Sequence, residues 1–160
     1  MISYKISKQI LKKGIIKIKD EKLKSVSSLN RVTSINIYSS INYPSGDNAA
    51  FDGFAINSND TKGFKNNSNK KFKIIGSIAA GDKPLRKKIL KFDTVEIMTG
   101  GIIPKGFDTI IPIEQIIFYP SKKSQKYIIV NKKIQKYNHV RFKGSDYKKN
   151  ELVIKKNTII

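Results

Sequence analysis

The sequence has no cysteine, one histidine and three arginines among its 160 residues. Without cysteine the chain can form neither disulfides nor thiolate metal sites, a composition compatible with a reducing compartment. The lone His139 excludes a histidine-rich metal cluster. Long apolar runs are absent too, and a membrane span would need about 18 such residues. We therefore expect a globular cytoplasmic protein that does not associate with a membrane.

The amino terminus, MISYKISKQILKKG, does not have the pattern of a secretory signal. Lysines interrupt the stretch that would have to be apolar, and there is no small-residue cleavage site. Instead, Ile6, Ile10 and Leu11 recur at helical spacing, and Gly14 is a typical stop signal. This pattern predicts a short helix over residues 4–13. The chain length suits one domain or two small lobes.

Charge is the strongest compositional feature, because the chain carries a net charge of +20 at pH 7. A basic protein of this kind could bind nucleic acid by releasing counterions from phosphates. However, residues 47–114, the glycine-rich centre, carry eleven basic and eight acidic side chains. Moreover, 29 of the 32 basic residues are lysine, whereas base and phosphate readout favours the planar fork of arginine. Nucleic-acid binding is therefore the less favoured interpretation, and the lysine excess resembles a compositional drift of the source.

Most of the chain alternates short β-branched runs with polar turns, which predicts a β-rich α+β fold. Three apolar runs, VEIM, TIIPIE and IIFY, are separated by TGG and PKG, and this punctuation favours a β meander. Pro112 lies in the second run and places that strand at a sheet edge or at a bulge. The predicted core consists of Ile74, Ile75, Val95, Ile97, Ile110 and Ile111, with Phe51, Phe54, Phe92 and Phe107.

Two short segments combine a glycine turn with a side chain that could carry chemistry. Asp52 precedes Gly53, and Asp-Gly is a typical hairpin turn because both positions tolerate positive φ. The same carboxylate could instead bind a hard cation such as Mg²⁺. Thr99 precedes Gly100 and Gly101, and this segment is either a plain turn or a nest that receives an anion such as phosphate. Each segment alone leaves both alternatives open.

Four segments in this order, NAAFDGFA, AAGD, MTGGIIPKGFDTIIPIE and HVRFKGSD, resemble the amino-terminal region of the molybdopterin molybdenumtransferase family, which includes MoeA and the gephyrin E domain. That family has a segment like N-S-A-M-D-G-Y-A, then A-G, then M-T-G-A-x-x-P-x-G-x-D-x-V with a closing Glu, and then N-V-R-x-x-G-x-D. The stretch SLNRV, which ends at Val32, fits its upstream G-R-V segment. The resemblance therefore covers nearly the whole chain, and it implies bifurcated β-sheets with one or two short helices.

The resemblance implies an enzyme that uses Mg²⁺ to insert molybdate into adenylylated molybdopterin with release of AMP, completing the molybdenum cofactor. Asp52, Thr99 and Asp146 match residues of the catalytic motifs, and Asp52 and Asp146 are the implied Mg²⁺ ligands. The implied substrate- or anion-binding residues are Gly53, Gly100, Gly101 and Arg141. Glu114 matches the closing glutamate, for which we expect a structural role. Carboxylates that hold a divalent cation, and an arginine that binds an oxyanion, suit this chemistry.

The sequence departs from the family pattern at several motif positions. These are Ala49, Phe51, Phe54, Gly101 and His139. Ala49 lacks the hydroxyl of the family's serine, whereas the other changes are mild. We expect His139 itself to be a surface or turn residue.

Family members continue into a molybdopterin-binding α/β domain and a small β domain, for which this sequence has no room. We expect a homodimer in which this chain supplies one wall of the active site and is incomplete for catalysis alone. The expected segments are a helix with a connecting strand (1–45), a β-rich substrate-facing lobe (46–146) and the start of a return segment (147–160). The alternative from another class is a small basic β-rich RNA-binding or ribosome-associated protein.

Overall fold

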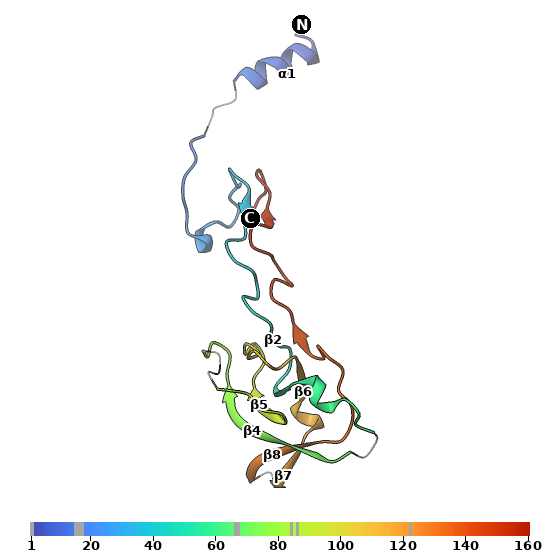
Figure 1. Ribbon diagram of the computed structural model, residues 1–160. Coiled ribbons are helices and arrows are strands. Elements are labelled where there is room, and N and C mark those ends of the chain that lie inside the picture. Colours follow the sequence, from blue (N-terminus) through green and yellow to red (C-terminus); the bar gives the residue numbers. More distant parts are fainter. Residues whose placement is uncertain (1, 15–17, 66–67, 84, 86, 122) are drawn as a thin grey trace. The chain divides into compact units, whose positions relative to one another are not determined.

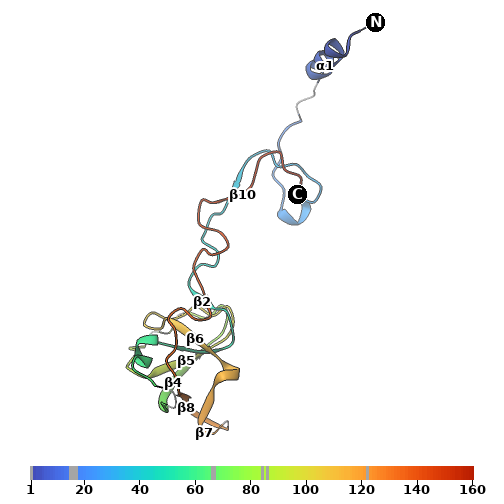
Figure 2. The ribbon, with the colours of Figure 1, turned by 90° about the vertical axis from the view of Figure 1, so that its right-hand side faces the viewer.

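The computed structural model describes residues 2–14, 18–65, 68–83, 85, 87–121 and 123–160. These residues form one α-helix, three short 3₁₀ helices and ten β-strands, so the predicted β-rich α+β fold is confirmed (Figures 1 and 2). The chain divides into unit 1, residues 1–37 with 152–160, and unit 2, residues 38–151. Within the described ranges there is no helix of the length and apolar character that crossing a membrane requires.

Unit 1 begins with helix α1 (Tyr4–Lys13), which has the predicted bounds. The Ser3 hydroxyl caps it by accepting the N–H of Ile6 at 3.4 Å, as serine commonly does at this position. At the other end the Gly14 N–H donates to the Ile10 carbonyl at 3.0 Å. A 3₁₀ helix, η1 (Ser25–Ser27), follows in the same unit.

Thr33 joins the two chain segments that make up unit 1, residues 1–37 and 152–160. Its buried hydroxyl donates to the Lys155 carbonyl at 2.7 Å and accepts the N–H of Thr158 at 3.0 Å. Next to these contacts, strand β10 (Leu152–Ile154) pairs with β1 (Ile37–Tyr38). Most of the first and last segments expected from the sequence therefore lie in one unit, although the division into three segments stays a prediction.

Unit 2 consists mainly of a six-stranded sheet in the order β6-β3-β5-β4-β8-β7. Its strands are β3 (Gly53–Ile56), β4 (Lys70–Ile78), β5 (Asp93–Ile97), β6 (Thr109–Pro112), β7 (Ile117–Ser121) and β8 (Ser124–Val130). β4 and β5 pair in parallel, and the other neighbours are antiparallel. A second sheet pairs β2 (Asn48–Ala49) with β9 (Val140–Arg141). Two 3₁₀ helices, η2 (Ser58–Thr61) and η3 (Ile113–Gln115), complete the unit.

The predicted meander of the three apolar runs is wrong. β3 lies between β5 and β6, and β7 pairs with β8 at the opposite edge of the sheet. Residues 98–108 separate β5 from β6, too long a connection for the two- to five-residue loop of a tight hairpin. Pro112 does lie in an edge strand, β6, as predicted, where the missing N–H leaves no gap in a ladder.

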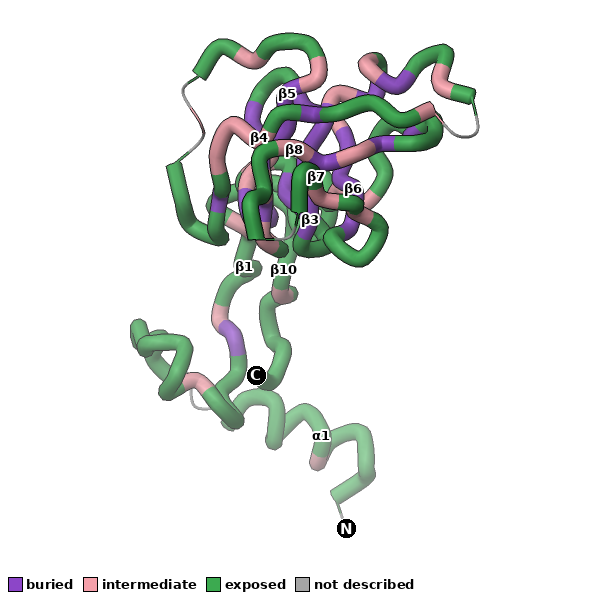
Figure 3. Tube along the Cα trace, turned by 90° about the horizontal axis from the view of Figure 1, so that it is seen from below, coloured by how far each residue is buried: buried purple, intermediate pink, exposed green. Residues whose placement is uncertain are grey.

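The core of unit 2 lies on both faces of β3. Because successive residues of a strand point to opposite faces, Ala55 packs in one cluster with Val95 and Ile110. Phe54 packs in the other cluster with Ile111. Figure 3 shows the buried stretches gathered along these strands. Strand β3 is therefore the central layer between two apolar clusters.

Four of the six aliphatic core predictions are confirmed, since Val95, Ile97, Ile110 and Ile111 are buried. Ile74 and Ile75 are half-buried and pack against the two clusters, so they lie at the border of the predicted core. Among the aromatics Phe54 and Phe107 are buried and Phe92 is half-buried. Phe51 is 51% exposed, which contradicts its predicted core position, and its ring lies edge-on to His139.

Gly53 is required by the close approach of two strands. A Cβ at this position would lie 2.1 Å from the Ile111 carbonyl oxygen of β6.

We expect Gly53→Ala to lower the free energy of unfolding by about 2 kcal/mol or more, because the backbones of two buried strands would have to separate. Gly46→Ala is the matched control, since its Cβ would meet Ile102 at an ordinary 3.4 Å. Denaturant unfolding measures both, and equal stability of the two variants would contradict this role.

Candidate functional site

Strand β2 brings three of the motif segments together. On one side Asn48 pairs with Arg141 of β9. On the other side the Ala49 N–H donates to the Gly101 carbonyl at 3.0 Å, and the Gly100 N–H donates to the Ala49 carbonyl at 2.9 Å. Both edges of this two-residue strand are therefore paired, and residues far apart in the sequence become neighbours.

The AAGD segment, residues 79–82, lies beside the same turn. The Met98 N–H donates to the Ile78 carbonyl at 2.9 Å, immediately before this segment. A Cβ on Gly100 would lie 3.5 Å from the Cβ of Ala80. All four motif segments of the resemblance thus meet around β2.

Asp52 and Thr99 are joined by two hydrogen bonds. Asp52 Oδ1 accepts both the backbone N–H and the hydroxyl of Thr99, each at 2.7 Å. The hydroxyl bond, and then the N–H bond, lower the pKa of Asp52 below its ordinary value, because both stabilise the carboxylate. Both side chains are exposed, so the carboxylate is held in place while it faces solvent.

The hairpin interpretation of Asp52 and Gly53 is wrong. β2 and β3 flank Asp52 but pair with other strands, and neither residue has a positive φ. Asp52 directly precedes β3, and its carbonyl accepts the N–H of Ile113 at 3.0 Å. The close contact between β3 and β6 explains why position 53 is glycine. The two hydrogen bonds from Thr99 explain why position 52 is aspartate.

The Thr99–Gly101 segment is a turn in which Gly100 has φ +82°. Its N–H groups have partners within the chain: Asp52 for Thr99, Ala49 for Gly100 and the Met98 carbonyl, at 2.8 Å, for Gly101. An anion could use these donors only by displacing those partners. Anion binding by Gly100 and Gly101 therefore stays a prediction.

Arg141 and Asp146 are also brought together, as an ion pair between the guanidinium and Asp146 Oδ2. The hydroxyl of Ser145 donates to the other carboxylate oxygen at 3.2 Å. Because an arginine guanidinium has five N–H donors, Arg141 keeps further donors for an oxyanion. The two predicted carboxylates, Asp52 and Asp146, thus have different partners.

The described part of the chain contains no group of three or more His, Cys, Asp or Glu side chains that could hold a metal ion. Such a cluster is not needed for Mg²⁺, which commonly takes one or two carboxylates with waters and phosphate oxygens. Asp52 fits such a role through its second oxygen, whereas Asp146 would first have to release Arg141. Glu114 is exposed in η3, and its structural role stays a prediction.

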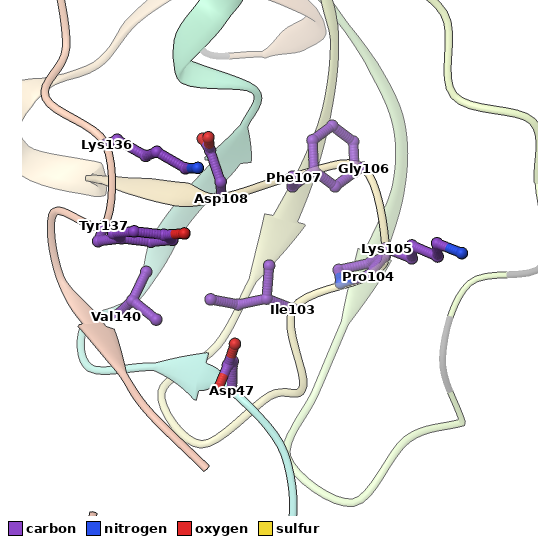
Figure 4. Close-up of a pocket in the computed structure, with 10 residues that line it drawn as sticks. All are labelled: Asp47, Ile103, Pro104, Lys105, Gly106, Phe107, Asp108, Lys136, Tyr137 and Val140. Carbon is purple, nitrogen blue, oxygen red and sulfur yellow. The ribbon is translucent and has the colours of Figure 1, made fainter.

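A pocket of about 370 Å³ lies beside β2 and β9, within unit 2 (Figure 4). Its lining includes Asp47, the PKGFD segment 104–108, and Tyr137. Neither Asp47 nor Tyr137 is among the site residues predicted from the sequence. Asp47 directly precedes β2, and that position next to a motif was the one available signal.

Asp108 was also missed, although it belongs to the quoted PKGFD stretch. Its carboxylate accepts the N–H of Ser58 at 2.7 Å and the Ser58 hydroxyl at 2.9 Å. Asp108 thus caps η2 across 50 residues of sequence. Because both oxygens of this carboxylate accept hydrogen bonds from Ser58, Asp108 stabilises the fold beside the pocket.

The β-rich lobe and the convergence of its four motif segments agree with the family resemblance seen in the sequence. A comparison with known protein families assigns the chain to the same family. The family model described as MoeA N-terminal region (domain I and II) matches residues 2–160. The chain belongs to this family.

Curated relatives and solved structures agree with this assignment. The molybdopterin molybdenumtransferase of Staphylococcus aureus (strain Mu50) is 32% identical over 133 residues, covering 83% of this chain and 30% of that protein. The Staphylococcus epidermidis (strain ATCC 35984) protein of the same name is 27% identical over 155 residues, covering 97% of this chain and 36% of that protein. A crystal structure of a molybdopterin biosynthesis MoeA protein from Pyrococcus horikoshii matches with a TM-score of 0.81 at 27% identity, covering all of this chain and 41% of that one. The fold is that of the MoeA amino-terminal region, and the chain spans about a third of the curated relatives' length.

The Thr99 hydroxyl should control the ionisation of Asp52. We expect Thr99→Val to raise the Asp52 pKa toward its ordinary value, because the larger of the two stabilising bonds is removed. In the wild type this bond contributes stability that is fully present above the unfolded-state pKa and is lost as the pH falls through the lower folded-state pKa. The stability difference between wild type and variant should therefore vanish in acid.

Carboxyl NMR titration measures the Asp52 pKa, and unfolding at several pH values measures the stability difference. Thr99→Ser is the matched control, since it keeps the hydroxyl. An Asp52 pKa that is the same in the valine and serine variants would show that the hydroxyl bond is not formed in solution.

Proposed function

We propose that this chain is the substrate-facing lobe of a molybdopterin molybdenumtransferase, which inserts molybdate into adenylylated molybdopterin and releases AMP. The convergence of four motif segments on β2, with Asp52 held by Thr99, carries the proposal. The relatives that bear this enzyme name support it. Adenylylated molybdopterin and molybdate are the proposed substrates, and a homodimer is the proposed assembly.

Asp52 is the proposed ligand-binding carboxylate. Its Oδ1 accepts two hydrogen bonds from Thr99, and among the described residues no hydrogen bond uses its Oδ2. A lowered pKa keeps the group ionised well below neutral pH. Thr99 thus acts as a positioning residue, and the second oxygen of Asp52 is free to bind a cation or a water.

Mg²⁺ is the proposed cofactor, with Asp52 as its ligand from this chain and Asp146 as a ligand only if its pair with Arg141 opens. When bound, the ion would offset the negative charge of the pyrophosphate under attack. The remaining donors of Arg141 suit an oxyanion such as molybdate or phosphate. Gly53, Gly100 and Gly101 shape the backbone next to these groups.

The RNA-binding alternative would use the part of the sheet where lysine and tyrosine side chains are neighbours. Lys73 pairs with Tyr127, and Tyr127 with Tyr119, across β4, β8 and β7. However, Lys71 Nζ lies 3.5 Å from the centroid of the Tyr119 ring. This ring face is already occupied by a cation of the same chain, so it is not open for a base to stack on.

We expect no tight RNA binding by this chain at physiological ionic strength. Fluorescence polarisation with a single-stranded RNA, at low and at physiological salt, is the measurement. Non-specific contacts of lysine with phosphate would give weak binding that falls steeply with salt. Binding that stays tight at physiological salt would favour the RNA-binding alternative over the transferase.

The Asp52→Asn substitution should lower the activity without lowering the stability, which distinguishes a role in the reaction from a role in folding. For the assay, the chain is joined to the part of the Staphylococcus aureus relative that follows the matched region. We expect molybdenum insertion to fall by at least ~10-fold, because removing a charge from a cation and oxyanion site weakens transition-state stabilisation by about 1.4 kcal/mol or more. Thermal unfolding should change little, since an exposed isosteric change usually costs less than about 0.5 kcal/mol.

Cofactor formation from adenylylated molybdopterin, molybdate and Mg²⁺ is the readout, and Asp20→Asn, at another exposed aspartate, is the matched control. Unchanged activity of Asp52→Asn would remove Asp52 from the site. A folded wild-type chimera without activity would contradict the transferase proposal itself.

A further inference from the structure

Asn48 of strand β2 carries a buried polar atom that has no partner. The residue is only 8% exposed, and no donor in the described part of the chain forms a hydrogen bond with its side-chain oxygen, Oδ1. A carbonyl oxygen that is buried without a donor destabilises the fold, and such atoms are rare in folded proteins. This oxygen therefore needs a physical explanation.

The pairing of β2 determines which side chains surround this oxygen. Asn48 lies directly opposite Arg141 of β9 and, on its other edge, directly opposite Ile102. Opposite residues of an antiparallel pair point to the same face, with Cβ atoms about 4.5–5.5 Å apart. Ile102, Asn48 and Arg141 thus form one row on that face. The isoleucine side chain has no hydrogen-bond donor, whereas the guanidinium has five.

Arg141 is the nearest side-chain donor to Asn48 on this face. His139 and Lys143, which lie two residues before and after Arg141, are diagonal to Asn48. Diagonal neighbours in such a pair are about 7–8 Å apart, farther than residues that are directly opposite. If a side chain of this lobe donates to the Asn48 oxygen, Arg141 is the best placed to do so.

In the structure, the Arg141 guanidinium pairs with Asp146 through one terminal N–H₂ group. Both side chains are exposed, and an exposed ion pair contributes little to stability. The pair can therefore open at a small cost. A guanidinium that leaves Asp146 and turns toward Asn48 gains a charge-assisted hydrogen bond, and the buried oxygen gains its missing donor.

We propose that Asn48 is a positioning residue that gives Arg141 a second hydrogen-bonding position. The guanidinium moves from Asp146 to the Asn48 oxygen when another group engages the Asp146 carboxylate. This exchange of partners rests on the geometry of β2 and β9 alone. Its use rests on the proposed function, in which Asp146 binds a cation only after its pair with Arg141 opens. The exchange frees that carboxylate and keeps the remaining arginine donors next to the site.

Removal of the Asp146 carboxylate should populate the second position. In Asp146→Ala we expect the guanidinium to bind Asn48, so the side-chain amide resonances of Asn48 should shift in NMR spectra of the whole chain. The same substitution made in an Arg141→Met background should leave these resonances in place, because the donor is then missing. Glu21→Ala, which removes the partner of Arg31 in unit 1, is the matched control and should not shift them either.

Denaturant unfolding tests the same inference in a second way. Asn48→Leu removes the unbonded oxygen and nearly keeps the shape, so in the wild-type chain it should not lower the unfolding midpoint. In the Asp146→Ala background it removes the acceptor of Arg141, and we expect the ratio of folded to unfolded chain to fall by at least ~10-fold. If Asn48→Leu does not fold, the NMR comparison decides alone. An equal effect of Asn48→Leu in both backgrounds, or an Asn48 shift that persists without Arg141, would overturn the inference.

Mg²⁺ alone, added to the wild-type chain, separates this inference from the proposed function. An ion that takes the Asp146 carboxylate should shift the Asn48 amide resonances as Asp146→Ala does. If the variant shifts them and Mg²⁺ does not, the second position of Arg141 stands and the proposed Mg²⁺ role of Asp146 is contradicted. If Asp146→Ala leaves them unchanged, the inference is wrong, whatever the activity of the transferase.

Discussion

The pairing of β2 on both of its edges is the constraint on which the rest of the site depends. Two residues, Asn48 and Ala49, hydrogen-bond to the glycine turn on one side and to β9 on the other. This pairing fixes the positions of Asp47, which directly precedes the strand, and of Asp52, which follows it. Both carboxylates are therefore placed by backbone hydrogen bonds, which vary far less with side-chain motion than contacts between long side chains do.

The few carboxylates of this basic chain mainly bind backbone N–H groups. Besides Asp47, Asp52 and Asp108, the side chains of Asp60, Asp82, Asp93 and Glu151 each accept a backbone N–H. By contrast, both ion pairs found among the described residues use an arginine, Arg31 or Arg141. No lysine forms an ion pair among the described residues, which agrees with a compositional origin of the lysine excess. The acidic residues position turns, so their placement says more about the structure than the placement of the lysines does.

Local features of the fold could be predicted from the sequence, whereas the order of the strands could not. Ser3 and Gly14 bound α1 through short-range hydrogen bonds, so periodicity and capping identify that helix. The insertion of β3 between β5 and β6 depends on contacts between residues more than 35 apart, such as Phe54 with Glu96, and no local pattern encodes them. Gly53 illustrates the difference: its need for glycine comes from Ile111 of β6, not from its own turn.

For the candidate site, motif spacing selected the candidate residues but could not predict their hydrogen bonds. The sequence paired Asp52 with Asp146 as equivalent carboxylates, yet one is bound by a neutral hydroxyl and an N–H, and the other by a guanidinium. Asp47 resembles Asp52 more closely, because each uses Oδ1 to accept a backbone N–H across the β2 pairing. In both, this bond fixes the carboxylate, and no hydrogen bond among the described residues uses the second oxygen. Bonding of a carboxylate through one oxygen only arises here from tertiary hydrogen bonds, so composition and spacing could not have distinguished Asp47 from an ordinary exposed aspartate.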